Sequence, residues 1–136
     1  IWEGTTNVLS LDALKVLALD GTWDAIHGAL MALTGQAGSE TEALSALVRE
    51  AERSVHAAHQ TAADQGRGEA LARNFAITLG RTFELALLIR HAAWSERAEG
   101  DRRPMAAARR FAVHGVDRMQ VGEDLDSRLL ATDDLE

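Results

Sequence analysis

The chain has 136 residues, 46% of them hydrophobic, and a formal net charge of −7. This length suits one domain, and the apolar share is large enough for a buried core. Cysteine is absent, which excludes disulfides, thiolate zinc sites and a cysteine nucleophile and agrees with a reducing compartment. No apolar run approaches about 18 residues and no secretory leader opens the chain, so we expect a cytoplasmic protein without a membrane span.

Apolar residues recur at helical spacing in five stretches, and no strand pattern competes with them. Aromatic residues make up only 4%, so we expect a core of Ala, Leu, Val and Ile, which favours close-packed helices. The expected helices run from Thr6 or Asn7 to about Leu19, from Thr22 to Gly35, from Ser39 to Gly66, from Glu69 to Ala98, and from Pro104 to about Met119.

The fourth stretch indicates how the helices are arranged. Residues 75–89 are apolar nearly all round, so we expect this helix to be central. Before it, Ser39 and Glu42 form a capping box that favours the start of the third helix. We therefore predict an all-α fold, an antiparallel bundle of about five helices over residues 1–121. An acidic, flexible tail is expected over residues 122–136.

Positive charge is concentrated in one part of the chain. Residues 67–119 carry ten arginines against six acids, and the densest group is Arg102, Arg103, Arg109 and Arg110. Such a group could face a phosphate, a nucleic acid or an acidic partner. No aromatic residues alternate with it to stack on bases, so the nucleic-acid signal is weak. The simpler interpretation is a solvated helix face that pairs with nearby acids.

The histidines are candidate metal ligands. His56 and His59 lie three residues apart on one expected helix, and Glu52 lies one turn before them. A di-iron carboxylate site requires Glu-x-x-His on two helices, and this sequence has no such motif. We therefore predict polar helix surface and no metal site. His27 and His114 lie near apolar faces and are interpreted as structural residues.

The first eight residues, Ile-Trp-Glu-Gly-Thr-Thr-Asn-Val, read as a loop that leads into a helix. Backbone N–H groups at a helix start favour an anion, including a pyrophosphate. A carboxylate beside an aromatic residue and a glycine could act as a desolvated general base. From the residues alone, the simpler interpretation is a plain N-terminal cap.

The segment Trp-Glu-Gly-Thr-Thr-Asn-Val at residues 2–8 resembles the aromatic-Glu-Gly-Thr-Ser/Thr motif in the carboxy-terminal domain of the acyl-CoA dehydrogenase family. Tryptophan in place of the usual tyrosine, and Leu-Asp-Ala-Leu at residues 11–14, are most similar to the alkylation-response branch of that family. The similarity covers residues 1–17 and implies that the chain is a carboxy-terminal fragment of a longer flavoprotein.

The resemblance also implies roles for individual residues. Glu3 would remove the α-proton of an acyl-CoA thioester while the β-hydrogen leaves as hydride to FAD, and its backbone N–H would polarise the thioester oxygen. Gly4 would lie beside the substrate with Glu3. Trp2 would wall the flavin or thioester pocket, and Thr5 and Asn7 would hydrogen-bond FAD near its phosphates.

The predicted function is therefore that of the carboxy-terminal domain of an FAD-dependent acyl-CoA dehydrogenase, inactive by itself. Its expected partners are the rest of the parent chain, the acyl-CoA substrate and further copies in a homo-oligomer, either a dimer or a tetramer. Two alternatives stay open. One is an alkylation-response-type flavoprotein that associates with nucleic acid through the arginine group at residues 102–110, and the other is a non-catalytic helical oligomerisation module.

Overall fold

The computed structural model describes residues 2–35, 41–65 and 68–119. In these ranges the chain forms five helices and no strand, which confirms the all-α prediction. None of the described helices is long and apolar enough to cross a membrane. The predicted acidic tail and Ser39 of the capping box lie outside the described residues. The helices are α1 (Trp2–Leu17), α2 (Thr22–Thr34), α3 (Glu42–Gln65), α4 (Gly68–Glu99) and α5 (Arg103–Val113).

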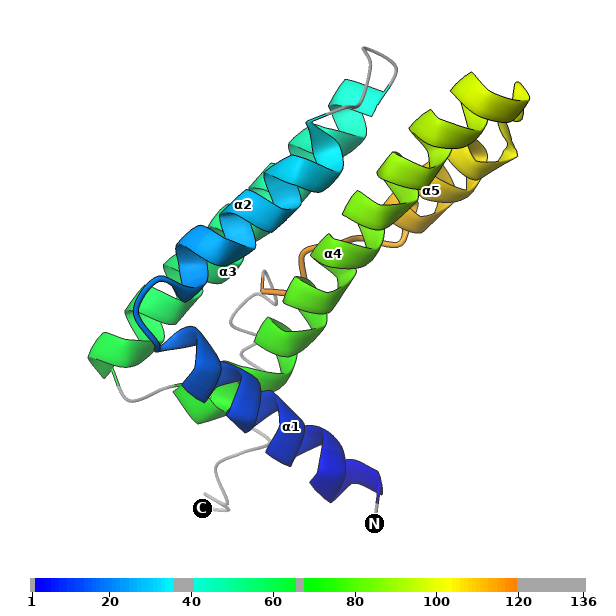
Figure 1. Ribbon diagram of the computed structural model, residues 1–136. Coiled ribbons are helices and arrows are strands. Elements are labelled where there is room, and N and C mark those ends of the chain that lie inside the picture. Colours follow the sequence, from blue (N-terminus) through cyan, green and yellow to red (C-terminus); the bar gives the residue numbers. More distant parts are fainter. Residues whose placement is uncertain (1, 36–40, 66–67, 120–136) are drawn as a thin grey trace.

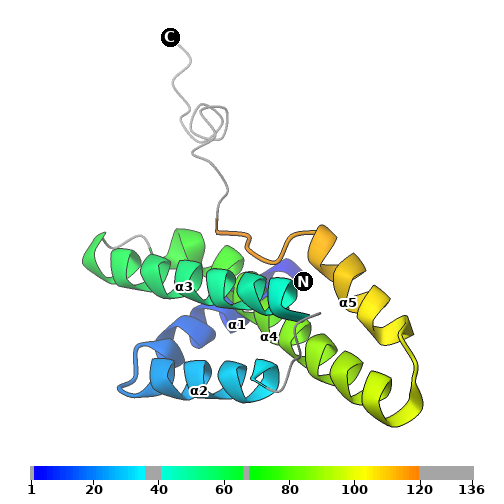
Figure 2. The same cartoon turned by 90° about the horizontal axis from the view of Figure 1, so that it is seen from above.

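Helices α2 to α5 run alternately up and down, and α1 crosses the lower end of α4 at a steep angle (Figure 1). Seen from above, α2 and α3 lie side by side on one side of α4, and α5 runs back along it (Figure 2). Helix α4 packs against each of the other four helices. Its central position agrees with the prediction from residues 75–89 of this helix, which are apolar nearly all round.

Helix α1 begins earlier than predicted. It starts at Trp2, so residues 2–8 are helical, and the expected loop with a cap at Thr6 or Asn7 is wrong. The apolar periodicity used for the prediction begins only at Val8, and the polar residues before it carry no such signal. Nothing in this segment blocks a helix, because it has no proline and one helical glycine costs only about 1 kcal/mol.

Helix α5 ends earlier than predicted. It stops at Val113, whereas the apolar spacing suggested that it continues to Met119. Gly115 has a φ of 76°, in the left-handed region, which ends a helix. Val116 is nevertheless buried and Met119 packs against the core, because the chain turns back onto α4 after Gly115.

Residues 114–119, which we call the strap, are fastened to the middle of α4. Arg81 Nε donates a hydrogen bond to the Gly115 carbonyl at 2.8 Å, and its guanidinium lies 4.4 Å from the centre of the Phe111 ring. The buried Thr78 hydroxyl accepts a hydrogen bond from the Arg118 backbone N–H at 2.9 Å. The strap thus gives the Thr78 hydroxyl, which is buried on α4, a hydrogen-bond partner.

The core consists of two clusters of unequal size. The smaller cluster contains Leu17, Val55 and Phe75, and it joins α1 to α3 and α4. The larger cluster is built by α2 to α5 and the strap, and its buried members are Leu30, Leu44, Val48, Ala51, Leu85, Ala86, Ile89, Ala92, Met105, Ala108 and Val116. Helix α1 is therefore attached to the bundle mainly through the smaller cluster.

The central position of α4 can be tested with Leu85→Ala. Leu85 is fully buried, so we expect the free energy of unfolding, measured by urea denaturation, to fall by about 2–5 kcal/mol. Leu9→Ala is the matched control, because Leu9 is 64% exposed on α1 and its loss should change stability by about 0.5 kcal/mol or less. Equal losses in both variants would contradict the packing described for α4.

Candidate functional site

The residues that the sequence assigns to catalysis and cofactor binding lie in the first turns of α1. Trp2, Glu3, Gly4, Thr5 and Asn7 are helical in backbone, and their side chains lie outside the described residues. The first four N–H groups of a helix have no acceptor within it, and the Glu3 N–H is one of them. The hydroxyl of Thr5 and the amide of Asn7 are groups that suit a pyrophosphate at such a helix start.

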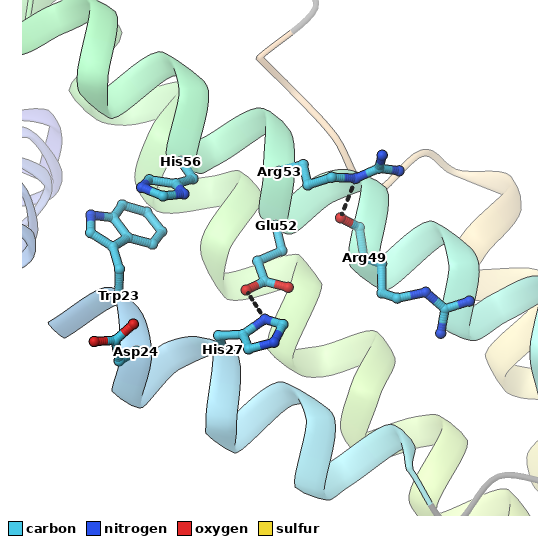
Figure 3. Close-up of a pocket in the computed structure, with 7 residues that line it drawn as sticks. All are labelled: Trp23, Asp24, His27, Arg49, Glu52, Arg53 and His56. Atoms are coloured by element: carbon cyan, nitrogen blue, oxygen red, sulfur yellow. Dashed lines mark hydrogen bonds and ion pairs between the residues drawn. The ribbon is translucent and has the colours of Figure 1, made fainter. Parts of the chain in front are cut away.

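A groove of about 600 Å³ lies between α2 and α3 (Figure 3). Most of the side chains that line it are charged, imidazole or aromatic groups, and the sequence did not predict it. Its lining residues are Trp23, Asp24 and His27 of α2 and Arg49, Glu52, Arg53 and His56 of α3.

Two pairs of side chains join α2 to α3 across this groove. His27 Nδ1 lies 2.8 Å from Glu52 Oε1, within hydrogen-bond distance. One turn away, the rings of Trp23 and His56 stack with centroids 4.7 Å apart and an angle of 24° between their planes. Trp23 also meets the edge of Phe75 from α4, with centroids 6.2 Å apart. The four residues of the pairs thus fasten α2 to α3, and Trp23 extends the contact to α4.

This pairing places three of the predicted polar residues differently from the expectation. Glu52 and His56 were considered together with His59 as one polar row on a single helix, but both contact α2 instead. The side chain of His59 lies outside the described residues. His27 is exposed and not set against an apolar face, although it is tied to Glu52. Among the described residues, no three His, Asp or Glu side chains are grouped closely enough to hold a metal ion.

The signal that could have revealed the groove is a repeat of four residues on both helices. Trp23 and His27 are four apart, and so are Glu52 and His56, so each pair lies on one face of its helix. When α2 and α3 lie antiparallel, Trp23 comes opposite His56 and His27 comes opposite Glu52. The pattern becomes visible only once α2 and α3 are known to be neighbours.

The two arginines that line the groove, Arg49 and Arg53, make their contacts with residues of α3 itself. Arg49 Nη2 lies 2.6 Å from Glu42 Oε1, and Arg53 Nε donates to the Arg49 carbonyl at 3.3 Å. Figure 3 shows both guanidinium groups directed away from Trp23 and His27. The groove therefore combines paired charges with an aromatic stack, an arrangement that stabilises the contact between the two helices.

The arginine group at residues 102–110 is divided in the structure. Arg102 Nε lies 2.9 Å from Glu96 Oε1, and Arg103 binds Asp101 through both its Nε and its Nη2. These two arginines thus pair with acids at the turn between α4 and α5. Arg109 and Arg110 are exposed on α5. Arg102 and Arg103 therefore fit the simpler interpretation, in which the arginines are solvated and pair with nearby acids.

The contacts of Trp23 with α3 and α4 can be tested by Trp23→Ala. We expect a loss of about 2 kcal/mol or more in the free energy of unfolding, because the indole contacts side chains of both α3 and α4. His27→Ala, one turn further along the same helix, should cost about 1 kcal/mol or less, since His27 is exposed. A larger loss for His27→Ala than for Trp23→Ala in chemical denaturation would contradict this description.

The turn between α4 and α5 predicts an effect of pH. The hydrogen bonds from the side chain and the backbone N–H of Arg103 lower the pKa of Asp101 from 3.8 to about 2. A pKa that is lower in the folded state than in the unfolded state stabilises the fold fully above pH 3.8, and this contribution is lost as the pH falls through about 2. Arg103→Ala should raise the pKa of Asp101 part of the way back, since the backbone N–H remains.

An NMR titration of the Asp101 carboxyl measures this shift directly. Arg109→Ala is the matched control on the same helix and should leave the pKa of Asp101 unchanged. An unchanged pKa in the Arg103→Ala variant would show that the ion pair at this turn is not formed.

Comparison with known proteins identifies the helical part of the chain. Residues 24–130 match the model of the family described as acyl-CoA dehydrogenase 11 C-terminal domain-like. The chain is also 36% identical over 107 residues to acyl-CoA dehydrogenase family member 11 of Caenorhabditis elegans. That alignment covers 72% of this chain but only 17% of the relative's length. No solved structure matches the chain significantly.

The family match and the motif at the start of α1 concern different residues. The matched region begins at residue 24, within α2, whereas the motif occupies residues 2–8 of α1. The match includes α3, α4, α5 and the strap, and thus most of the larger core cluster. The chain therefore belongs to the acyl-CoA dehydrogenase 11 C-terminal domain-like family.

Proposed function

We propose that this chain is the carboxy-terminal part of an FAD-dependent acyl-CoA dehydrogenase and that Glu3 is the base of the reaction. The observation that carries the proposal is the order of two independent similarities along the chain. The motif that resembles the base-bearing segment of the family, at residues 2–8, lies shortly before the domain matched by the family model, which begins at residue 24. A chance motif would have no reason to stand at this position.

The chemistry follows from a carboxylate placed beside a thioester. Glu3 accepts the α-proton of the acyl-CoA, and its own backbone N–H, which has no acceptor within α1, donates to the thioester oxygen. Polarising that oxygen acidifies the α-carbon, so a carboxylate becomes a sufficient base. FAD, when bound, supplies the acceptor for the β-hydride. Gly4, which has no side chain, lets the substrate approach the backbone closely.

The remaining motif residues would hold the cofactor. Thr5 and Asn7 would offer a hydroxyl and an amide to the phosphates of FAD, and Trp2 would offer a flat apolar wall to the flavin or the thioester. These residues form only one side of a site, because the aligned part of the C. elegans relative is 17% of its length. We therefore expect the 136-residue chain alone to be inactive. The absence of cysteine agrees with a cytoplasmic protein.

The nucleic-acid alternative receives less support than the dehydrogenase. Two of the four arginines proposed to contact a phosphate backbone, Arg102 and Arg103, are paired with Glu96 and Asp101. An acid that already neutralises an arginine competes with phosphate for it. The assembly alternative is favoured by a different observation, since the large apolar side chains of Leu87 and Trp94 on α4 are 52% and 49% exposed. It is compatible with a catalytic parent.

The base is tested in the parent protein with Glu3→Gln. Glutamine keeps the shape of the side chain but cannot accept a proton, so we expect FAD to remain bound while its reduction by acyl-CoA slows by about 10²–10⁴-fold. Stopped-flow absorbance without oxygen, with a panel of acyl-CoAs, measures the rate. Glu50→Gln, an exposed carboxylate on α3, is the control and should keep the wild-type rate.

Each outcome separates the possibilities. Full reduction of the Glu3→Gln variant would reject Glu3 as the base. A wild-type parent whose flavin no acyl-CoA reduces would reject the dehydrogenase function and leave the alkylation-response alternative. A parent that binds no flavin would reject both.

A further inference from the structure

Helix α1 packs against the bundle through its last two turns. In the part of α1 where side chains are described, Ser10 and Leu17 are buried, and Leu14 packs against the smaller core cluster. Just before these turns, Val8 and Leu9 are 56% and 64% exposed. Figure 1 shows that α1 crosses α4 and extends past it toward the amino terminus. The described contacts with the bundle therefore lie toward the carboxyl end of α1.

Phe75 of α4 is the largest buried side chain at this contact. It is 1% exposed and lies in one cluster with Leu17 of α1 and Val55 of α3. Its ring meets that of Trp23 from α2 edge to face, with centroids 6.2 Å apart and an angle of 83° between the planes. An aromatic neighbour in this geometry favours one orientation of the Phe75 ring. The ring therefore fills the space where α1, α2 and α3 meet on α4.

The length of α1 makes the position of Glu3 sensitive to this contact. Glu3 and Leu17 belong to the same unbroken helix. Their separation in sequence corresponds to about 21 Å along the helix axis, so a tilt of about 5° at Leu17 moves the backbone of Glu3 by about 2 Å. A displacement of about 1 Å from the reactive geometry can lower a rate by about 100-fold. Small changes in the packing of Leu17 are thus enlarged at Glu3.

We infer that Phe75 is a positioning residue for Glu3: it sets the angle at which α1 crosses α4 and thereby places the base. Phe75 acts through Leu17 and the rigid length of α1, not on the reacting atoms. Removing its ring leaves a cavity under the end of α1, and a close-packed contact that loses a large side chain lets its neighbours shift. The catalytic part of the inference rests on the proposed function, whereas the geometric part concerns the described helices alone.

The geometric part is tested in the 136-residue chain, which has no cysteine of its own. Spin labels at Leu9→Cys on α1 and Arg90→Cys on α4, both exposed positions, report the distance between the two helices by double electron–electron resonance. We expect Phe75→Ala to shift or broaden the distance distribution by about 1 Å or more, because Leu9 lies about 12 Å from Leu17 along the helix. Phe75→Leu, which keeps an apolar side chain, should change it less.

Leu85→Ala is the matched control for this measurement. Leu85 is fully buried on the same helix, but it belongs to the larger core cluster, whose described members include no residue of α1. Its loss should destabilise the fold and leave the distance distribution unchanged. An unchanged distribution in the Phe75→Ala variant, or an equal change in the Leu85→Ala variant, would overturn the inference.

The catalytic part is tested in the parent protein by the limiting rate of flavin reduction per bound flavin. Phe75→Ala should lower this rate about 10–100-fold while the dissociation constant of the acyl-CoA changes by less than about threefold. Leu85→Ala should keep the wild-type rate, because lower stability reduces the amount of folded flavoprotein and not the rate per flavin. A wild-type rate in the Phe75→Ala variant would overturn the inference. A wild-type parent that no acyl-CoA reduces would reject the proposed function instead, and the distance measurement then decides the geometric part.

Discussion

The burial of α4 on several sides is the constraint on which the rest of this structure depends. Helix α4 has 32 residues and contacts all four of the other helices, so each of those helices packs against the same central element. A helix in this position must also satisfy any polar group that it carries inward. Thr82 does so by donating to the Thr78 carbonyl at 2.7 Å, and Thr78 does so by accepting from the strap. Packing and hydrogen bonding thus specify the same arrangement.

This constraint explains which features could be predicted from the sequence. The central helix was predictable because residues 75–89 are apolar nearly all round, and the break at Gly35 is a local signal. The strap was not predictable, because the contact of Arg81 with Gly115 spans 34 residues and has no local pattern. The start of α1 was missed because its first residues have no apolar period. The role of Glu3 stays a prediction, since it depends on chemistry that helix periodicity does not encode.

The two parts of the chain differ in how they are held. Helix α1, with the motif, lies outside the matched region of residues 24–130 and joins the bundle through the small cluster around Leu17, Val55 and Phe75. Trp23 packs against the same cluster and connects it to the α2–α3 groove. If Glu3 is the base of a dehydrogenase, the packing of these few side chains determines where Glu3 lies relative to the helical domain. Substitutions in the small cluster would then affect catalysis without touching a substrate.

The strap has a consequence for the kinetics of folding. Antiparallel neighbours such as α2 with α3, and α4 with α5, are adjacent in sequence, so their contacts form early and quickly. The bonds from Arg81 to Gly115 and from Thr78 to Arg118 join residues 34 and 40 positions apart, and we expect them to form after the bundle has assembled. Contacts that are absent from the transition state govern the rate of unfolding and have little influence on the rate of folding. We therefore expect the hydrogen bonds of the strap to set the rate at which the folded bundle unfolds.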